Sequence, residues 1–325
     1  MKNQTKRILL AGYILVGQIT LSAAVNPDNT ADTKQKYDWD NYPVPVKTEG
    51  NVKWELQSQS DDFNYEAPAE NKSKEFFSKW TDFYHNHWTG PAPTFWRKDH
   101  VWVSEGLLRI KATRPEDAPK KRVVSAGFDK ELPVTYTGCI TSTKRVKYPV
   151  FVEARVKIAK SVMASDVWML SPDDTQEIDI LEAYGSDRAE KGPGYFPKCL
   201  HLSHHVFIRN PFKDYQPTGP QTWYQENGTI WNEDFHNIGV YWKNPFHLEY
   251  YVDGELVRTV NTKDIIDPNN YTNGTGLEKE LDIIINMEDQ SWRAARGLTP
   301  TDEELKNEEN NTFLVDWIRV YKPIK

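Results

Sequence analysis

Three carboxylic acids lie close together in one apolar stretch and are the clearest candidates for chemistry in the sequence. The stretch reads Glu177-Ile178-Asp179-Ile180-Leu181-Glu182. Side chains of a β-strand alternate between two faces, so Glu177 and Asp179 would project together while the isoleucines face a core. Glu182 follows Glu177 at an odd interval and would point away on a regular strand. One β-bulge between Asp179 and Glu182 would return it to the carboxylate face.

Such a face is typical of a glycosidase, in which one carboxylate attacks the sugar and a second carboxyl group donates a proton. Crowded carboxyl groups push one another's pKa values apart, which keeps one of them protonated near neutral pH. The alternative is a solvated strand face that happens to carry acids. We favour catalysis, because three acids on one face repel one another and a purely structural strand has little reason to keep them.

The elements around this stretch are predicted to be strands. Residues 151–158 alternate with a period of two, and residues 281–287 and 313–321 read as further strands. Asp253-Gly254 suits a type I′ turn, so residues 247–252 and 255–260 should form a hairpin, as should residues 101–103 and 107–110. Helical patterns are confined to residues 73–84 and to a capping box at Thr301 and Glu304. Many strands and few helices predict an all-β sandwich or barrel.

The composition indicates an exported, acidic protein. The 325 residues carry a formal net charge of −7 and include 12 tryptophans. Residues 1–24 combine basic residues, an apolar run and Ser22-Ala23-Ala24, as a signal peptide does, and residues 25–45 read as a flexible leader. Residues 46–325 would form one catalytic domain. The chain lacks a basic cluster for nucleic acid and a later apolar segment for a membrane span. The sequence leaves open whether Cys139 and Cys199 pair.

Several motifs in the same order resemble the glycoside hydrolases of family 16, and among them most closely the β-agarases. The resemblance covers nearly the whole chain from about Val46. The segments that carry it are Trp168-Met169-Leu170, Asp173 to Gly185 around the three acids, His201 to Phe212, Asp82 to Asn86, Gly138 to Ser142, and Val315 to Pro323.

The resemblance implies a β-jelly-roll sandwich of two curved antiparallel sheets, with a substrate cleft across the concave face. It also implies endo-hydrolysis with retention of anomeric configuration. Glu177 takes the position of the nucleophile and Glu182 that of the general acid/base, with Asp179 between them. A retaining mechanism requires the two glutamate carboxyl groups to lie only about 5–5.5 Å apart.

The resemblance and the residue types also suggest binding residues. Trp88 and Trp168 are the predicted aromatic platforms for sugar rings, and Arg209 has a fork of donors that suits sugar oxygens. Asn286 and Glu288 match family positions that face the cleft, although a strand-end cap would use the same residue types. A surface ion pair is the alternative for Arg209.

Two places in the sequence carry residue types that could bind a metal ion. His201, His204 and His205 could supply ligands, but neighbouring strand residues face opposite ways, so we expect no cofactor for catalysis. A structural Ca²⁺ ion is common in the family, and Asp316 and the backbone carbonyl of Gly106 match its oxygen ligands. An acid on a solvated edge strand is the alternative for Asp316.

The favoured function is a secreted, periplasmic or surface-exposed bacterial endo-β-agarase, acting as a monomer on the β-1,4 galactosidic bonds of the red-algal galactan agarose and releasing neoagaro-oligosaccharides. A β-porphyranase or another galactan hydrolase of the family shares the same catalytic strand. A non-catalytic galactan-binding lectin is a third class, which the intact Glu177, Asp179 and Glu182 disfavour. The choice between agarose and porphyran depends on loop residues that the sequence does not place.

Overall fold

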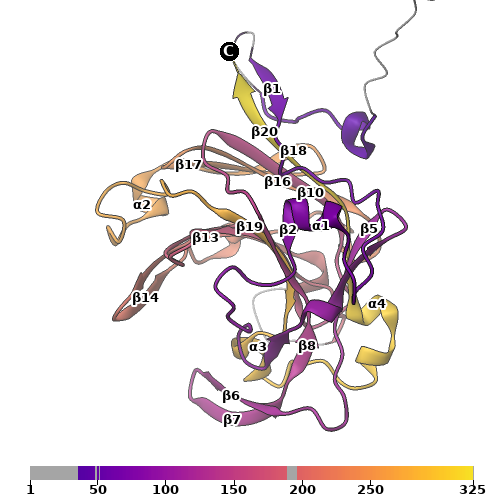
Figure 1. The fold of residues 1–325 in the computed structure, drawn as a ribbon. Coiled ribbons are helices and arrows are strands. Elements are labelled where there is room, and N and C mark those ends of the chain that lie inside the picture. Colours follow the sequence, from indigo (N-terminus) through magenta and orange to yellow (C-terminus); the bar gives the residue numbers. More distant parts are fainter. Residues whose placement is uncertain (1–35, 48–49, 51, 189–195, 325) are drawn as a thin grey trace, which may run out of the picture. The chain divides into compact units, whose positions relative to one another are not determined.

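The computed structural model describes residues 36–47, 50, 52–188 and 196–324. The chain divides into two units, Met1–Lys36 and Tyr37–Lys325. The predicted signal peptide, residues 1–24, lies outside the described residues, and the fold is that of the second unit (Figure 1). Among the described helices, none is long and apolar enough to cross a membrane.

Two antiparallel sheets, each of eight strands in the described part of the chain, form the second unit. The outer sheet has the order β18 (Glu255–Val260), β17 (His247–Val252), β16 (His236–Asn244), β10 (Val150–Lys157), β20 (Thr312–Ile324), β5 (Leu107–Lys111) and β4 (Val101–Ser104), with β1 (Lys53–Leu56) paired to β20. The inner sheet has the order β14 (Phe212–Tyr215), β13 (Leu200–Arg209), β12 (Gln176–Tyr184), β11 (Ala164–Leu170), β19 (Asp282–Glu288), β9 (Cys139–Ser142) and β2 (Trp80–Thr81), with β15 (Trp223–Tyr224) paired to β13.

The remaining elements are short. Two small ribbons pair β3 (Thr94–Trp96) with β8 (Thr135–Thr137) and β6 (Lys120–Ser125) with β7 (Phe128–Pro133). The α-helices are α1 (Lys74–Lys79), α2 (Lys263–Ile266), α3 (Ser291–Ala294) and α4 (Glu308–Asn311). The 3-10 helices are η1 (Asp38–Asn41), η2 (Lys98–His100), η3 (Phe196–Lys198), η4 (Pro220–Thr222) and η5 (Glu304–Lys306). This architecture confirms the predicted jelly-roll sandwich.

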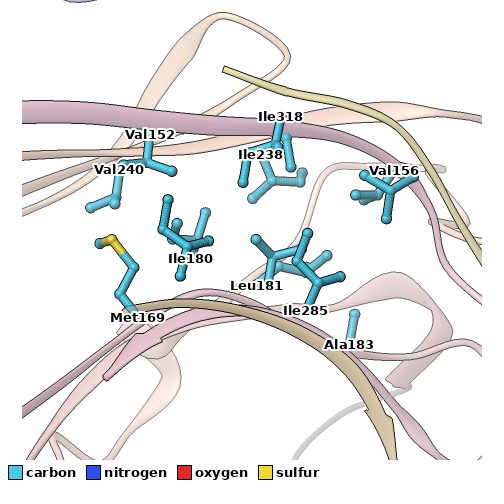
Figure 2. Packing of buried hydrophobic residues seen from close by; sticks show 14 of the residues in the cluster. Val152, Val156, Met169, Ile180, Leu181, Ala183, Ile238, Val240, Ile285 and Ile318 are labelled. Carbon is cyan, nitrogen blue, oxygen red and sulfur yellow. The ribbon is translucent and has the colours of Figure 1, made fainter. Parts of the chain in front are cut away.

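The core fills the space between the two sheets. Figure 2 shows Val152 and Val240 of the outer sheet opposite Met169 and Ile180 of the inner sheet, which curves beneath them. Full burial of an aliphatic side chain of this size contributes about 1.5–3 kcal/mol. The apolar face of β12 therefore anchors the strand firmly, and this anchoring offsets the repulsion among the acids on its other face.

Two local predictions need correction. The helical pattern of residues 73–84 forms only the short helix α1, capped by the Ser73 hydroxyl, because Trp80 leaves it to begin β2 and is buried in the core. Residues 37–45 were expected to be flexible, yet Trp39 is buried against Trp317. The second unit begins at Tyr37, earlier than the predicted start of the catalytic domain.

The two cysteines are too far apart to bridge. Cys139 begins β9, and Cys199 directly precedes β13. Three strands (β12, β11 and β19) lie between β13 and β9 in the inner sheet. Neighbouring strands are spaced by about 4.8 Å, so the separation far exceeds the span of a disulfide.

Candidate active site

A cleft of about 1160 Å³ lies on the face of the inner sheet that points away from the core. Side chains from β11, β12, β13 and β14 line it, together with residues that follow β2 and β19. The lining includes the predicted residues Glu177, Asp179, Glu182, Trp88, Trp168, Arg209 and Glu288. The structure thus brings seven of the eight predicted catalytic and substrate-binding residues to one cavity.

The predicted bulge in β12 is present. The register with β13 pairs Asp179 with Ser203 and next Glu182 with His201, so the β12 segment is one residue longer than its partner. Ile180 and Leu181 are consecutive, yet both belong to the core between the sheets, as Figure 2 shows. The alternation of faces therefore restarts after Leu181, and Glu182 joins the acids on the cleft side.

The nucleophile candidate Glu177 is in an environment that favours its protonated form. Burial, and then the negative charge of Asp179, raise the pKa of Glu177 well above its usual value. Burial also raises the pKa of Asp179. The nearest cationic partner of both acids is His205, whose Nε2 lies 3.6 Å from Asp179 Oδ2 and 3.8 Å from Glu177 Oε1. Its positive charge lowers both pKa values and opposes the effect of burial.

The environment of Glu182 favours the ionised form. The Tyr184 hydroxyl and the Gln290 amide donate to Glu182 Oε1 at 2.6 and 2.7 Å, and His201 Nδ1 lies 2.5 Å from Oε2. Burial would raise the pKa of Glu182, but these hydrogen bonds outweigh burial and hold the pKa at about 2. The His201 ring stacks on Trp223 with centroids 4.4 Å apart, which fixes its orientation.

Two further acids in the cleft have raised pKa values. Burial, and then the charge of Glu182, raise the pKa of Glu288 to about 8. Burial, and then the charge of Glu288, raise the pKa of Asp166 well above its usual value. Sequence reasoning missed Asp166, although it lies two residues before Trp168 on the same strand and therefore on the same face. Together with Asp174 and Asp214, these acids bring seven carboxyl groups to one cavity.

Two hydrogen bonds in series fix the predicted platform Trp168. Its Nε1 donates to Asn286 Oδ1 at 2.6 Å, and the Asn286 amide donates to Asp166 Oδ2 at 2.8 Å. Asn286 is fully buried and does not line the cleft, contrary to the prediction that it faces substrate. It lies on the predicted strand face, where its side chain is hydrogen-bonded to both Trp168 and Asp166. Trp168 itself is 9% exposed and stacks beside Tyr84.

The other two predicted binding residues are accessible in the cleft. Trp88 is 46% exposed, and its ring meets those of Tyr84 and Trp96 edge to face. The Arg209 guanidinium lies over the Phe207 ring at 4.4 Å from its centroid. It forms no ion pair with any residue that the structure describes, so its donors are available to a ligand.

The three histidines of β13 do not converge on one point. His201 contacts Glu182, and the buried His204 contacts the carbonyl oxygen of Ile266 at 3.2 Å. His205 Nδ1 lies 2.8 Å from Asp214 Oδ1. Because each imidazole has its own partner in a different direction, they do not form a shared metal site with one another.

The two predicted calcium ligands lie near further oxygen atoms. Arg155 Nε donates to Asp316 Oδ2 at 2.9 Å. Burial, and to a smaller extent the negative charge of Asp38, raise the pKa of Asp316, whereas Arg155 lowers it. The Asn64 amide nitrogen donates a hydrogen bond to Asp38 Oδ2 at 2.9 Å. The Oδ1 atom of Asn64 is also close to Gly106, at 3.0 Å from the position that a Cβ atom on this glycine would occupy. Hard oxygen donors of this kind fit Ca²⁺, although Arg155 already supplies positive charge.

Comparisons with known proteins agree on one family. Residues 54–323 match the family model described as the glycoside hydrolase family 16 (GH16) domain of β-porphyranases A–D. The chain is 68% identical over 288 residues to a β-agarase of Phocaeicola plebeius, a match that covers 88% of this chain and 90% of that protein. It is 54% identical over 315 residues to β-agarase B of Zobellia galactanivorans, covering 90% and 85%.

Solved structures give the same result. The chain resembles β-agarase B of Zobellia galactanivorans with a TM-score of 0.81 and 53% identity, over 88% of this chain and 99% of that one. An inactivated mutant of β-agarase B in complex with agaro-octaose matches with a TM-score of 0.81 and 52% identity, over 88% and 99% of the two chains. The fold, the cleft and these relatives lead to one conclusion: the chain belongs to glycoside hydrolase family 16.

Proposed function

We propose that this glycoside hydrolase is an exported endo-β-agarase that cleaves the β-1,4 galactosidic bonds of agarose with retention of configuration. The observation that carries the proposal is the cleft face of β12. There Glu177 and Glu182 lie on one strand face and have opposite electrostatic environments, which is what a pair of nucleophile and acid/base requires. Relatives named as β-agarases support the substrate.

In the proposed mechanism, a carboxylate oxygen of Glu177 attacks the anomeric carbon while Glu182 gives its proton to the leaving glycosidic oxygen. A covalent glycosyl–Glu177 ester forms. In the second step, Glu182 removes a proton from a water molecule, whose oxygen attacks the same carbon and releases Glu177. The roles of the two residues follow their positions in the family motif.

In the free cleft the two protonation states are the reverse of those that the mechanism requires. Hydrogen bonds keep Glu182 as a carboxylate, and burial favours a protonated Glu177. The reactive order therefore needs one proton moved to Glu182 and one ionised Glu177. We propose that substrate binding, which removes water from the cleft, drives the transfer of the proton of Glu177 to Glu182, so that the pair carries one proton before and after the change.

Agarose is the favoured substrate because of the charge of the cleft. Asp166, Glu177, Asp179, Glu182 and Glu288 line it, and among the described lining residues Arg209 is the only arginine or lysine. A sulfated polymer carries fixed negative charge, and a site built for sulfate normally presents several cations. The family model that matches is described for β-porphyranases, so porphyran is the second candidate.

A parallel assay tests the substrate. Reducing ends are measured on agarose, native porphyran, desulfated porphyran, carrageenan and laminarin. The proposal predicts the highest kcat/KM on agarose and better turnover of desulfated than of native porphyran. A clear preference for native porphyran would contradict the agarase assignment and leave the fold and the catalytic residues unaffected. Binding of agarose without any release of reducing ends would instead favour the lectin alternative.

We also propose a structural Ca²⁺ ion, held by Asp316 together with Asp38 and oxygen atoms near Gly106. The support is the gathering of hard oxygen donors described above. The proposed site includes Asp316 of β20, a strand of the outer sheet, whereas the cleft lies on the inner sheet. The ion therefore has no part in the proposed chemistry. Its expected role is to neutralise Asp38 and Asp316, whose charges otherwise repel each other.

A further inference from the structure

His205 joins the acidic pair of β12 to the hairpin arm formed by β13 and β14. On one side its Nε2 lies within 3.8 Å of both Glu177 and Asp179. On the other side its Nδ1 lies 2.8 Å from Asp214 of β14. The ring is parallel to Phe207, with centroids 5.2 Å apart and an interplanar angle of 16°. Asp214 and Phe207 together fix the direction in which Nε2 points.

One of the oxygen atoms that His205 faces has no other partner. Asp179 is 7% exposed, and its Oδ2 is buried and makes no hydrogen bond with any described residue. His205 is also the single ion-pair partner that the described residues provide for either Asp179 or Glu177. A buried carboxylate without a compensating charge is costly, so the ionised forms of both acids depend on this imidazole.

The charges around His205 favour the imidazolium. Burial lowers the pKa of His205, but Glu177, Asp214 and Asp179 outweigh burial and raise the pKa to about 10. Other charged groups near the pair are Glu182 and His201, which act on Asp179, and Glu288, which acts on Glu177. His204, on the opposite face of β13, is kept neutral because burial lowers its pKa to about 3.

We propose that His205, oriented by Asp214, is a positioning residue whose fixed positive charge opposes the burial of Glu177 and Asp179, so that Glu177 loses its proton and can attack at a lower pH than it would without this imidazole. The proposal rests on the roles assigned under Proposed function. It identifies the cation in the cleft that counters the burial of the nucleophile. The same imidazole is too far from Glu182 to replace His201 there, since no contact joins His205 and Glu182 in the described structure.

The test uses His205→Gln and Asp214→Asn in the full-length protein, with His236→Gln as the matched control. His236 forms an equivalent pair with Asp253 at 2.7 Å, but it lies on β16 of the outer sheet. The pH profile of kcat/KM is measured on a soluble agarose oligosaccharide, because its acidic limb reports the ionisation of the free nucleophile.

The expected result for His205→Gln is an acidic limb shifted to higher pH by about one unit or more, as loss of an opposite charge within about 4–6 Å predicts. Asp214→Asn, at a more accessible position, should shift the limb in the same direction by less. The His236→Gln profile should coincide with that of the wild type. Acidic limbs that stay in place for both cleft variants, with only kcat reduced, would overturn the proposal.

A second readout does not depend on activity. Nitrogen-15 NMR of the imidazole of His205, identified by its loss in His205→Gln, should show a protonated ring at pH 8; a neutral ring at that pH would overturn the proposal. The configuration of the first product of the wild type distinguishes a failure of the proposed function from a failure of the role of His205 alone. An α-anomer would contradict the proposed function, whereas a β-anomer with unshifted acidic limbs would contradict the role of His205 alone.

Discussion

Replacement of Trp168 separates two roles that the structure assigns to one side chain. The indole ring lines the cleft as a platform, and its Nε1 hydrogen satisfies the buried Asn286 Oδ1 at 2.6 Å. Trp168→Ala removes both contributions, whereas Trp168→Phe keeps an aromatic ring and removes only the hydrogen-bond donor. The two variants should therefore differ in binding and resemble each other in the stability defect that comes from Asn286.

Loss of an aromatic contact costs about 1–3 kcal/mol, so Trp168→Ala should weaken oligosaccharide binding by roughly 5- to 150-fold. For Trp168→Phe we expect binding within about 1 kcal/mol of the parent. Both variants should lose about 1–3 kcal/mol in the free energy of unfolding, because Asn286 is 0% exposed and keeps a buried acceptor without a donor. Trp168→Ala should lose more, because it also leaves a cavity.

Binding is measured by calorimetry with an agarose octasaccharide in an inactive Glu177→Ser background, and stability is measured by urea unfolding. Phe77→Ala is the control, because Phe77 is 48% exposed and lies outside the cleft. Equal binding by the Ala and parent proteins would refute the platform. A Trp168→Phe variant as stable as the parent would refute the role of the Asn286 hydrogen bond.

Two further predictions concern the ion and export. Millimolar Ca²⁺ should raise the melting temperature of the chelator-treated protein by about 3 °C or more, and Asp316→Ala should abolish the increase, while an equal response of both proteins would contradict the site. Protein isolated from the native host should begin near Val25 and be found outside the cytoplasm; an intact Met1 on cytoplasmic protein would contradict the signal peptide.

The sequence predicted those parts of the molecule that depend on local patterns. Alternation located the long strands, and Asp253-Gly254 fixed the β17–β18 hairpin at its predicted bounds. The odd spacing between Glu177 and Glu182 predicted the bulge that the register shows. These features follow from side-chain periodicity and turn conformation, which neighbouring residues determine by themselves.

The sequence did not reveal the groups that surround the acids, because they depend on pairing between distant segments. His201 meets Glu182 through the register of β12 with β13, and Gln290 reaches it from the end of β19, 108 residues away. The burial of Asn286 also depends on a distant segment of the chain. Its strand face was predicted, but its side chain is hydrogen-bonded to Trp168 and Asp166 of the neighbouring strand β11, and no local pattern encodes that pairing.

The most direct test of the central claim concerns the roles of Glu177 and Glu182. Glu177→Ala and Glu182→Ala are each incubated with an activated aryl agaro-oligosaccharide and azide, and the azide product is identified by proton NMR. The proposed roles predict an α-glycosyl azide from Glu177→Ala, because azide then attacks directly in place of the nucleophile. The same roles predict a β-glycosyl azide from Glu182→Ala, because azide then opens the covalent intermediate. The reverse pair of products would show that Glu182 is the nucleophile and would contradict the assignment of both residues.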